Sequence, residues 1–420
     1  MSAPPDSPRP LDGVRVIELS SEMGAMAGKL LADMGADVIL VEPPGGDPTR
    51  DYPPFLDDEP GPDRSLFWWH YQTSKRGVTL DLDQDDDRER FRRLVASADV
   101  LLECERPGRP ADLGIDFPQL AELRPELIMA SVTAFGRNSP SRHEQFTDLT
   151  LLAGGGPAWS TGYDDHSLPP VRGGGNQGYN TACHYAVMSI LTALLHREVS
   201  GRGQHIDVSA YAANNVTTEM ASYTWLVQQG TVQRQTGRHA MEQPSLPSQL
   251  ACADGRWVTT GFPPRHPREL RWLYDWIVEL GAEVEFPEAI FLKQGAERSE
   301  PLDIQLIGED DEVTAIFSAS REGLVLVASK VSAYEFFERT QKAGISTGVI
   351  YSPEEALQDD QFQARGFPVE VHHPELDRSF TYPGAPYKFG RTPWRITRRA
   401  PRLGEHQHEV FADLEPAPAD

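Results

Sequence analysis

The sequence predicts an α/β protein, with a large doubly wound domain built on a parallel sheet and a second, smaller α+β domain. Three observations lead to this fold class. The chain has 420 residues, more than one ordinary hydrophobic core accommodates. Its first third alternates short, β-branched apolar runs with helix-like segments, a pattern typical of parallel sheets covered on both faces. From about residue 215 to 330 short strands are mixed with tryptophan-rich helices.

The first β-α-β unit lies close to the N-terminus. A β-branched run predicts a strand over residues 14–19, a helix containing Leu30 and Leu31 follows, and another apolar run predicts a strand over 36–42. The segment 43–48 then forces a loop, because its prolines cannot donate helix or ladder hydrogen bonds.

The same alternation continues to about residue 135. It predicts strands over 78–82, 98–103 and 127–132, with helices over 85–97 and 117–123 between them. Ligands of such open sheets bind outside the carboxyl ends of the strands. After two glycine-rich stretches, an apolar segment predicts a long helix over 181–195 that leads to Gly201.

Composition excludes several classes of function. With 39 Lys and Arg against 63 Asp and Glu, the net charge of -24 disfavours nucleic acid as a partner. No apolar run approaches the roughly 20 residues that span a bilayer, and no export signal precedes the first strand, so we expect a cytoplasmic protein without membrane contact. The cysteines, Cys104, Cys183 and Cys252, lack metal-site spacing, so neither disulfides nor a metal are expected.

Several motifs occur in a characteristic order. They are LADMGADVI at 31–39, EPPGGDPTR at 42–50, Lys75-Arg76, RPG at 106–108 and SGRGQ at 200–204. In this order the chain resembles CoA-transferase family III, from about residue 11 to 406. The resemblance implies two chains threaded through one another as rings, in an interlocked dimer. It also implies a large CoA-binding domain begun by residues 11–214, a small domain over 215–330, and a return segment over 331–413 that completes the large domain.

By the same resemblance, CoA or an acyl-CoA is the expected substrate cofactor, lying along the carboxyl ends of the large-domain strands. The candidate cofactor-binding residues are Lys75, Arg76, Leu80, Cys104, Glu105, Arg106, Thr133 and Phe135. Lys75 and Arg76 fit a phosphate clamp and, equally, an ordinary surface pair beside an aromatic core. The same two interpretations apply to Arg106. Glu105 would repel a pyrophosphate.

Counted back from Gly201, the nucleophilic aspartate of the family falls on Tyr179. In the family's reaction a carboxylate attacks an acyl-CoA, forms a mixed anhydride and then carries CoA as a thioester. A phenol has a reference pKa near 10 and forms an ester instead of an anhydride, so a tyrosine is not chemically equivalent. We expect Tyr179 to pack at the start of its helix or to position substrate. No catalytic residue is assigned.

The sequence therefore favours a subunit of an acyl-CoA:carboxylate CoA-transferase, paired with a homologous subunit that bears the aspartate. The alternatives are a self-sufficient homodimer with relocated catalytic groups and a non-enzymatic acyl-CoA binder. A racemase is disfavoured, because the histidine base expected before Asp148 is absent and Asp148 is expected only to shape a turn. An oxidoreductase is disfavoured because residues 24–28 do not form a G-x-G-x-x-G fingerprint.

Overall fold

The computed structural model describes residues 7–236, 238–242 and 248–414. The chain forms two compact units. The first contains the chain up to Ala158, Arg172–Ser222 and the chain from Leu357 on, and the second contains Trp159–Val171 and Tyr223–Ala356. No helix within these described ranges combines the length and apolar character that crossing a membrane requires.

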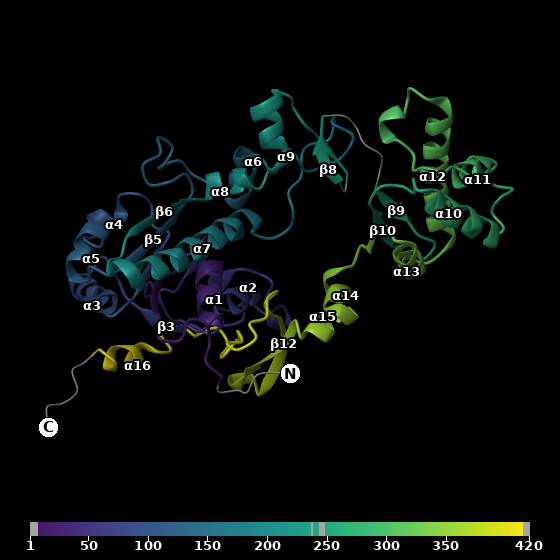
Figure 1. The fold of residues 1–420 in the computed structure, drawn as a ribbon. Helices are drawn as coiled ribbons and strands as arrows, with labels where there is room; N and C mark the ends of the chain where they lie inside the picture. The colour runs from purple at the N-terminus through teal and green to yellow at the C-terminus, as the bar shows by residue number, and fades with distance from the viewer. Residues whose placement is uncertain (1–6, 237, 243–247, 415–420) are drawn as a thin grey trace. The chain divides into compact units, whose positions relative to one another are not determined.

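A six-stranded parallel sheet forms the centre of the first unit, and Figure 1 labels its strands β3, β5 and β6. The strand order is β3-β2-β1-β4-β5-β6. Its strands are β1 (Arg15–Leu19), β2 (Asp37–Glu42), β3 (Arg76–Thr79), β4 (Val100–Glu103), β5 (Ile128–Thr133) and β6 (His205–Ser209). The strand order reverses between β1 and β4, which is the switch point of a doubly wound sheet. The predicted α/β class is therefore observed in this unit.

Helices cover both faces of this sheet because alternate strand residues point to opposite sides. Val16 packs on the same side as α1 (Ala25–Asp33) and the long helix α7 (Gln177–Ser200). Ile17 packs on the other side, with residues of α3 (Asp85–Ala96), α5 (Phe117–Leu123) and α16 (Gln407–Ala412). The remaining helices and strands of the unit are α2 (Leu66–Tyr71), α4 (Arg109–Asp112), α6 (Asp148–Gly155), α8 (Ala210–Val216), α9 (Met220–Tyr223), α15 (Asp360–Arg365) and the hairpin of β12 (Pro368–His373) and β13 (Arg378–Pro383).

The C-terminal segment closes the open edge of β3. The Gly77 N–H donates to Nδ1 of His406 at 3.1 Å, and the His406 N–H donates to the Gly77 carbonyl at 2.9 Å. The Gln407 side chain accepts from the Thr79 N–H at 2.8 Å and donates to the Thr79 carbonyl at 3.1 Å. Residues at the start of α16 thus make the hydrogen bonds that a seventh strand would make.

The second unit has its own core around a small antiparallel sheet, β11-β10-β9. Leu270, Leu273, Trp276, Ile316 and Phe336 are fully or almost fully buried in this core. Its elements are β7 (Gln233–Gln235), β8 (Arg238–Met241), β9 (Gln249–Ala251), β10 (Trp257–Thr260), α10 (Pro267–Glu279), α11 (Ala289–Ala296), α12 (Asp311–Lys330), α13 (Ala333–Ala343), β11 (Thr347–Val349) and, at its end, α14 (Pro353–Gln358).

The second unit differs from the predicted small domain, residues 215–330, in three ways: it starts later, at Tyr223, it ends later, and it gains a separate segment. The second unit extends past residue 330 because β11 pairs with β10, and it includes residues 159–171 because that segment bonds to the region of β7. The strand predicted over 78–82 begins two residues earlier, at Arg76. Strand β6 was not predicted, because it is an edge strand whose partly exposed polar residues do not form an apolar run.

Candidate active site

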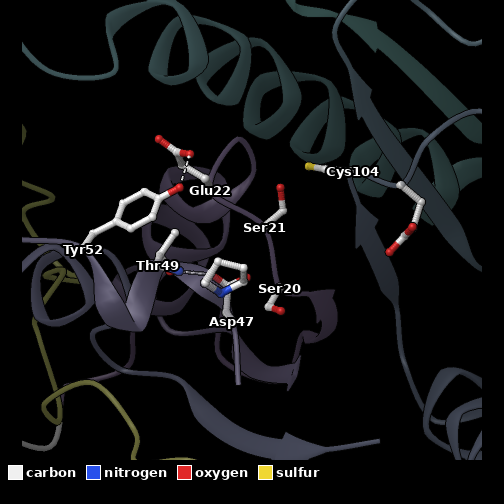
Figure 2. A pocket seen from close by; sticks show the side chains of 9 residues that line it. Ser20, Ser21, Glu22, Asp47, Thr49, Tyr52 and Cys104 are labelled. Atoms are coloured by element: carbon white, nitrogen blue, oxygen red, sulfur yellow. Dashed lines mark hydrogen bonds between the residues drawn. The ribbon is translucent and has the colours of Figure 1, made fainter. Parts of the chain in front are cut away.

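A cavity of about 320 Å³ lies at the switch point of the sheet (Figure 2). Three loops that follow β1, β4 and β2 supply its walls, as expected for an open parallel sheet. The lining residues are Ser20, Ser21, Glu22, Cys104, Glu105, Asp47, Pro48, Thr49 and Tyr52. A second cavity of about 270 Å³ shares part of this lining and continues past the ends of β2 and β3 to Leu80, Asp83 and Arg109. We call the first the switch-point cavity.

Acidic side chains dominate both cavities. Glu22, Asp47 and Glu105 line the switch-point cavity, and neither lysine nor arginine is among its lining residues. Burial raises the pKa of Glu105. In the second cavity, Nη2 of Arg109 lies 2.6 Å from Oδ1 of Asp83, so the positive charge is already paired. The arginine that lines the second cavity is therefore surrounded by carboxylates, which disfavours the binding of a phosphate.

Lys75 is fully buried beneath α1 instead of facing a cavity. Its Nζ lies 2.7 Å from Oε2 of Glu18 and donates to Oε1 of Gln72 at 2.6 Å and to the Ala25 carbonyl at 3.2 Å. The Glu18 carboxylate lies so close to α1 that a Cβ on Gly28 would be 1.9 Å from Oε2. All three ammonium donors have protein partners. Full burial does not fit the alternative of a surface pair, and the phosphate-binding role of Lys75 stays a prediction.

Arg76 also forms ion pairs within the fold. Its guanidinium donates to both Asp37 oxygens, at 2.9 and 2.7 Å, and to Glu409 at 2.9 Å and Asp413 at 3.1 Å. Arg76 thereby ties β3 to β2 and to the C-terminal helix. Its predicted role as a phosphate clamp stays a prediction, and its donors are engaged.

The other predicted cofactor residues are dispersed. Leu80, Cys104 and Glu105 line the cavities, as stated above. Arg106 is exposed on the loop after β4. Thr133 is buried, and its hydroxyl accepts from the Gly136 N–H at 3.0 Å. Phe135 packs against the rings of Phe146 and Tyr211.

Cys104 is held as a thiol at the edge of the switch-point cavity. Burial raises the pKa of its thiol well above the usual value. A Cβ on Gly24 would lie 2.7 Å from its Sγ, so the start of α1 approaches the sulfur closely. A thiol that stays neutral is a weak nucleophile.

Tyr179 lies in the first turn of α7 and is 6% exposed. Its ring packs edge-to-face with Phe146, at a centroid distance of 6.4 Å. Burial and the neighbouring carboxylates of Glu22 and Asp148 raise the pKa of its hydroxyl well above 10. The side chain is therefore a neutral phenol at physiological pH.

Asp148 supplies the negative charge at the start of α7. Its Oδ1 accepts from the Tyr179 backbone N–H at 2.9 Å, and its Oδ2 lies 3.4 Å from Nη1 of Arg172. The residue is buried as the first residue of α6, where the sequence suggested only a turn. A carboxylate at this position compensates the positive end of the helix dipole.

Glu22 connects the cavity to the same helix. Its carboxylate accepts from the Tyr52 hydroxyl at 3.1 Å and from Nδ2 of Asn176, the residue preceding α7, at 2.9 Å. Figure 2 shows Tyr52 and Glu22 pointing toward each other across the cavity wall. Sequence reasoning missed Glu22, although its place shortly after β1, at the carboxyl edge of the sheet, was a usable signal.

Asn214 completes the surroundings of this helix start. It is fully buried, and neither atom of its side-chain amide has a hydrogen-bond partner among the described residues. A Cβ on Gly178 would lie 2.9 Å from Oδ1 of Asp148 and 3.1 Å from Nδ2 of Asn214, so a side chain there would collide with both. Across the described part of the chain, no group of three or more His, Cys, Asp or Glu could hold a metal ion.

The chain matches the family model of CoA-transferase family III over residues 11–407. It is 32% identical over 406 residues to subunit BbsE of succinyl-CoA:(R)-benzylsuccinate CoA-transferase from Thauera aromatica, covering 95% of this chain and 93% of the relative. It is 31% identical to succinate–glutarate CoA-transferase from Agrobacterium fabrum, covering 99% and 98%. Its fold is similar to that of a CAIB/BAIF family protein from Brucella suis, with a TM-score of 0.78, 24% identity and coverage of 97% and 100%.

Proposed function

Because the chain belongs to CoA-transferase family III, we propose that it is the non-catalytic subunit of an acyl-CoA:carboxylate CoA-transferase. A homologous subunit supplies the nucleophilic aspartate, and the two chains interlock as rings. The observation that carries this proposal is the state of Tyr179, a buried and neutral phenol at the position assigned to the nucleophile.

The chemistry of the transfer supports this role for Tyr179. The nucleophile must be ionised, and it must form an anhydride that CoA can then attack. The raised pKa of the phenol removes the first property, and an aryl ester lacks the second. Loss of an essential nucleophile costs on the order of 10⁴ or more in rate, which corresponds to about 5 kcal/mol.

The acidic lining supports the same proposal from the side of the cofactor. The carboxylates of Glu22, Asp47 and Glu105 would repel a pyrophosphate, and Lys75 forms an ion pair with Glu18. One of the relatives is itself a subunit, and the names of both contain succinyl-CoA or succinate. We therefore propose succinyl-CoA as the acyl donor of the complex and a second carboxylic acid as the acceptor.

The test is CoA exchange between succinyl-CoA and a panel of carboxylates, measured for the chain alone and for the chain co-expressed with an aspartate-bearing homologue. We expect turnover only from the pair, and Tyr179→Phe in the pair should leave the rate unchanged. Robust turnover by the chain alone would contradict the proposal. Binding of acyl-CoA by an inactive chain that forms no complex would instead indicate the non-enzymatic binder.

One observation favours a second candidate, a self-sufficient homodimer. Glu22 lines the switch-point cavity, and its carboxylate lies beside the start of α7, whereas Asp148 is buried and engaged with Tyr179 and Arg172. In that case Glu22 would carry CoA as a thioester. Mass spectrometry after incubation of the chain with succinyl-CoA would then show a CoA adduct, absent from Glu22→Gln but present in Asp148→Asn.

A further inference from the structure

A third cavity, in the second unit, differs from the other two in its charge. It has a volume of about 470 Å³, within the usual range of small-molecule sites. Its lining residues are Trp159, His166, Ser167, Leu168, Pro169, Pro170, Gln233 and Arg234, without any Asp or Glu. We call it the Arg234 cavity.

Hydrogen bonds tie the two walls of the Arg234 cavity together. Nε1 of Trp159 donates to the Val232 carbonyl at 3.2 Å, and Nε2 of His166 lies 3.0 Å from the Arg234 carbonyl. The Asp164 N–H donates to the Thr236 hydroxyl at 3.1 Å. The segment 159–170 is thus held against the strand that carries Arg234, and the cavity wall is a defined structure.

Arg234 is buried, with 7% of the residue exposed, and it lines the cavity. Its Nη2 donates to the carbonyls of His166 at 3.3 Å and Leu168 at 2.6 Å, while Nε has no hydrogen-bond partner among the described residues. Asp165, the acid nearest in sequence to His166, is exposed and makes no ion pair with Arg234 among the described contacts. Hydrogen bonds from Ser167 lower the pKa of Asp165 most, and the charge of Arg234 adds a weaker effect. A buried cation facing a cavity without acids is costly unless an anion neutralises it.

The backbone at Gly162 closes over the same side chain. A Cβ there would lie 2.9 Å from Cδ and 3.2 Å from Nε of Arg234, and the φ of +145° is one that L-residues rarely adopt. A residue without a side chain at this position lets the loop wrap closely around the arginine. The guanidinium is therefore fixed in place before any ligand arrives, which lowers the entropy cost of binding.

We propose that the Arg234 cavity binds the carboxylate of a small organic acid whose apolar body lies against Trp159, Leu168 and the adjacent prolines. A planar guanidinium matches a carboxylate, and one cation beside apolar walls suits a monoanion better than a phosphate, which needs several donors. The site lies in the second unit, and its occupation requires no transfer chemistry from the first.

Binding to the full-length chain tests the proposal. The probes are phenylacetate, its neutral analogue phenylacetamide and inorganic phosphate, titrated by calorimetry. We expect phenylacetate to bind about tenfold or more tightly than either other probe, and Arg234→Gln to abolish that preference, as loss of a charge-assisted pair does. Arg234→Lys should retain part of it. The matched control is Arg268→Gln, because the Arg268 side chain is 80% exposed in the same unit, and it should bind as the wild type does.

Three outcomes would overturn the proposal. They are equal binding of acid and amide, equal or tighter binding of phosphate, and unchanged phenylacetate binding by a folded Arg234→Gln chain. If that variant does not fold, the answer comes from Trp159→Leu and from wild-type fluorescence. A phenylacetate-induced change in emission that Trp159→Leu removes supports the site, and a change that persists unaltered in this variant contradicts it.

Discussion

The switch-point cavity and the Arg234 cavity carry opposite charges in one chain. Glu22, Asp47 and Glu105 line the first without a lysine or arginine, and Arg234 and His166 line the second without an acid. The net charge of -24 agrees with the acidic lining of the switch-point cavity. It does not predict the basic lining of the Arg234 cavity. The difference shows that local pairing, and not overall composition, decides which cavity can accept an anion.

The cations near the parallel sheet are paired within the fold. Lys75 meets Glu18, and Arg50 donates to both oxygens of Glu42 at 2.7 Å. Such pairs add little net stability, but loss of one partner leaves the other charge buried without a counter-ion. Arg234 has backbone carbonyls as its partners instead, so its charge remains available.

The largest expected effect comes from Lys75→Met, which would leave Glu18 buried without its counter-ion. We expect the free energy of unfolding to fall by about 3–5 kcal/mol, measured by urea denaturation. The control is Lys330→Met, which breaks a partly exposed pair with Glu285 and should cost less than about 1 kcal/mol. A stable Lys75→Met chain would restore Lys75 as a candidate for phosphate binding.

A smaller effect is expected from Glu103, which lies beneath the switch-point cavity at the end of β4. Burial raises its pKa to about 7 in the folded chain. The carboxyl favours folding while it is protonated, and this contribution is lost as the pH rises from about 4.5 through 7. Relative to Glu103→Gln, the wild type should lose about 2–3 kcal/mol across this window.

Urea denaturation of both chains at pH 5 and pH 8 measures this difference. The comparison with Glu103→Gln cancels the other titrating groups. If the free energy of unfolding changes equally in the two chains between pH 5 and pH 8, Glu103 titrates normally. The end of the sheet would then be less buried than the structure indicates.

The next effect concerns Asp148, which compensates the start of α7. Asp148→Asn keeps an oxygen acceptor for the Tyr179 N–H but removes the charge, so we expect a loss of about 1–2 kcal/mol in thermal or urea unfolding. Asp85→Asn is the matched control at the exposed start of α3, where about 0.3 kcal/mol is expected. Equal effects of the two variants would argue against a special role for Asp148.

The smallest expected effect concerns Glu105 and anion binding. Glu105→Gln should raise the affinity of the chain for ADP roughly 3–10-fold, because a negative charge leaves the cavity lining. Since burial raises the pKa of Glu105, the wild type should approach the variant as the pH falls. Calorimetry with ADP measures both trends, with the exposed Glu89→Gln on α3 as control. An unchanged affinity would remove the electrostatic contrast between the cavities.

Much of the first unit could be predicted from the sequence, because buried parallel strands form near-continuous apolar runs. Strand β6 could not, since its polar residues resemble a loop. Glu22 and Tyr52 escaped prediction because they converge only once the strand order is known. The partner of Lys75 was equally hidden, since Glu18 lies 57 residues earlier in the chain.

The closure of β3 by His406 and Gln407 has a consequence for biosynthesis. Strand β3 emerges from the ribosome early, whereas the side chain that caps Thr79 comes 328 residues later. At typical translation speeds this interval is roughly 15–65 s, during which the nascent sheet presents an unpaired edge that can recruit other chains. Production of this protein should therefore depend on chaperones that shield the ribosome-bound chain, and a premature stop codon near the 3′ end of its message should yield aggregates.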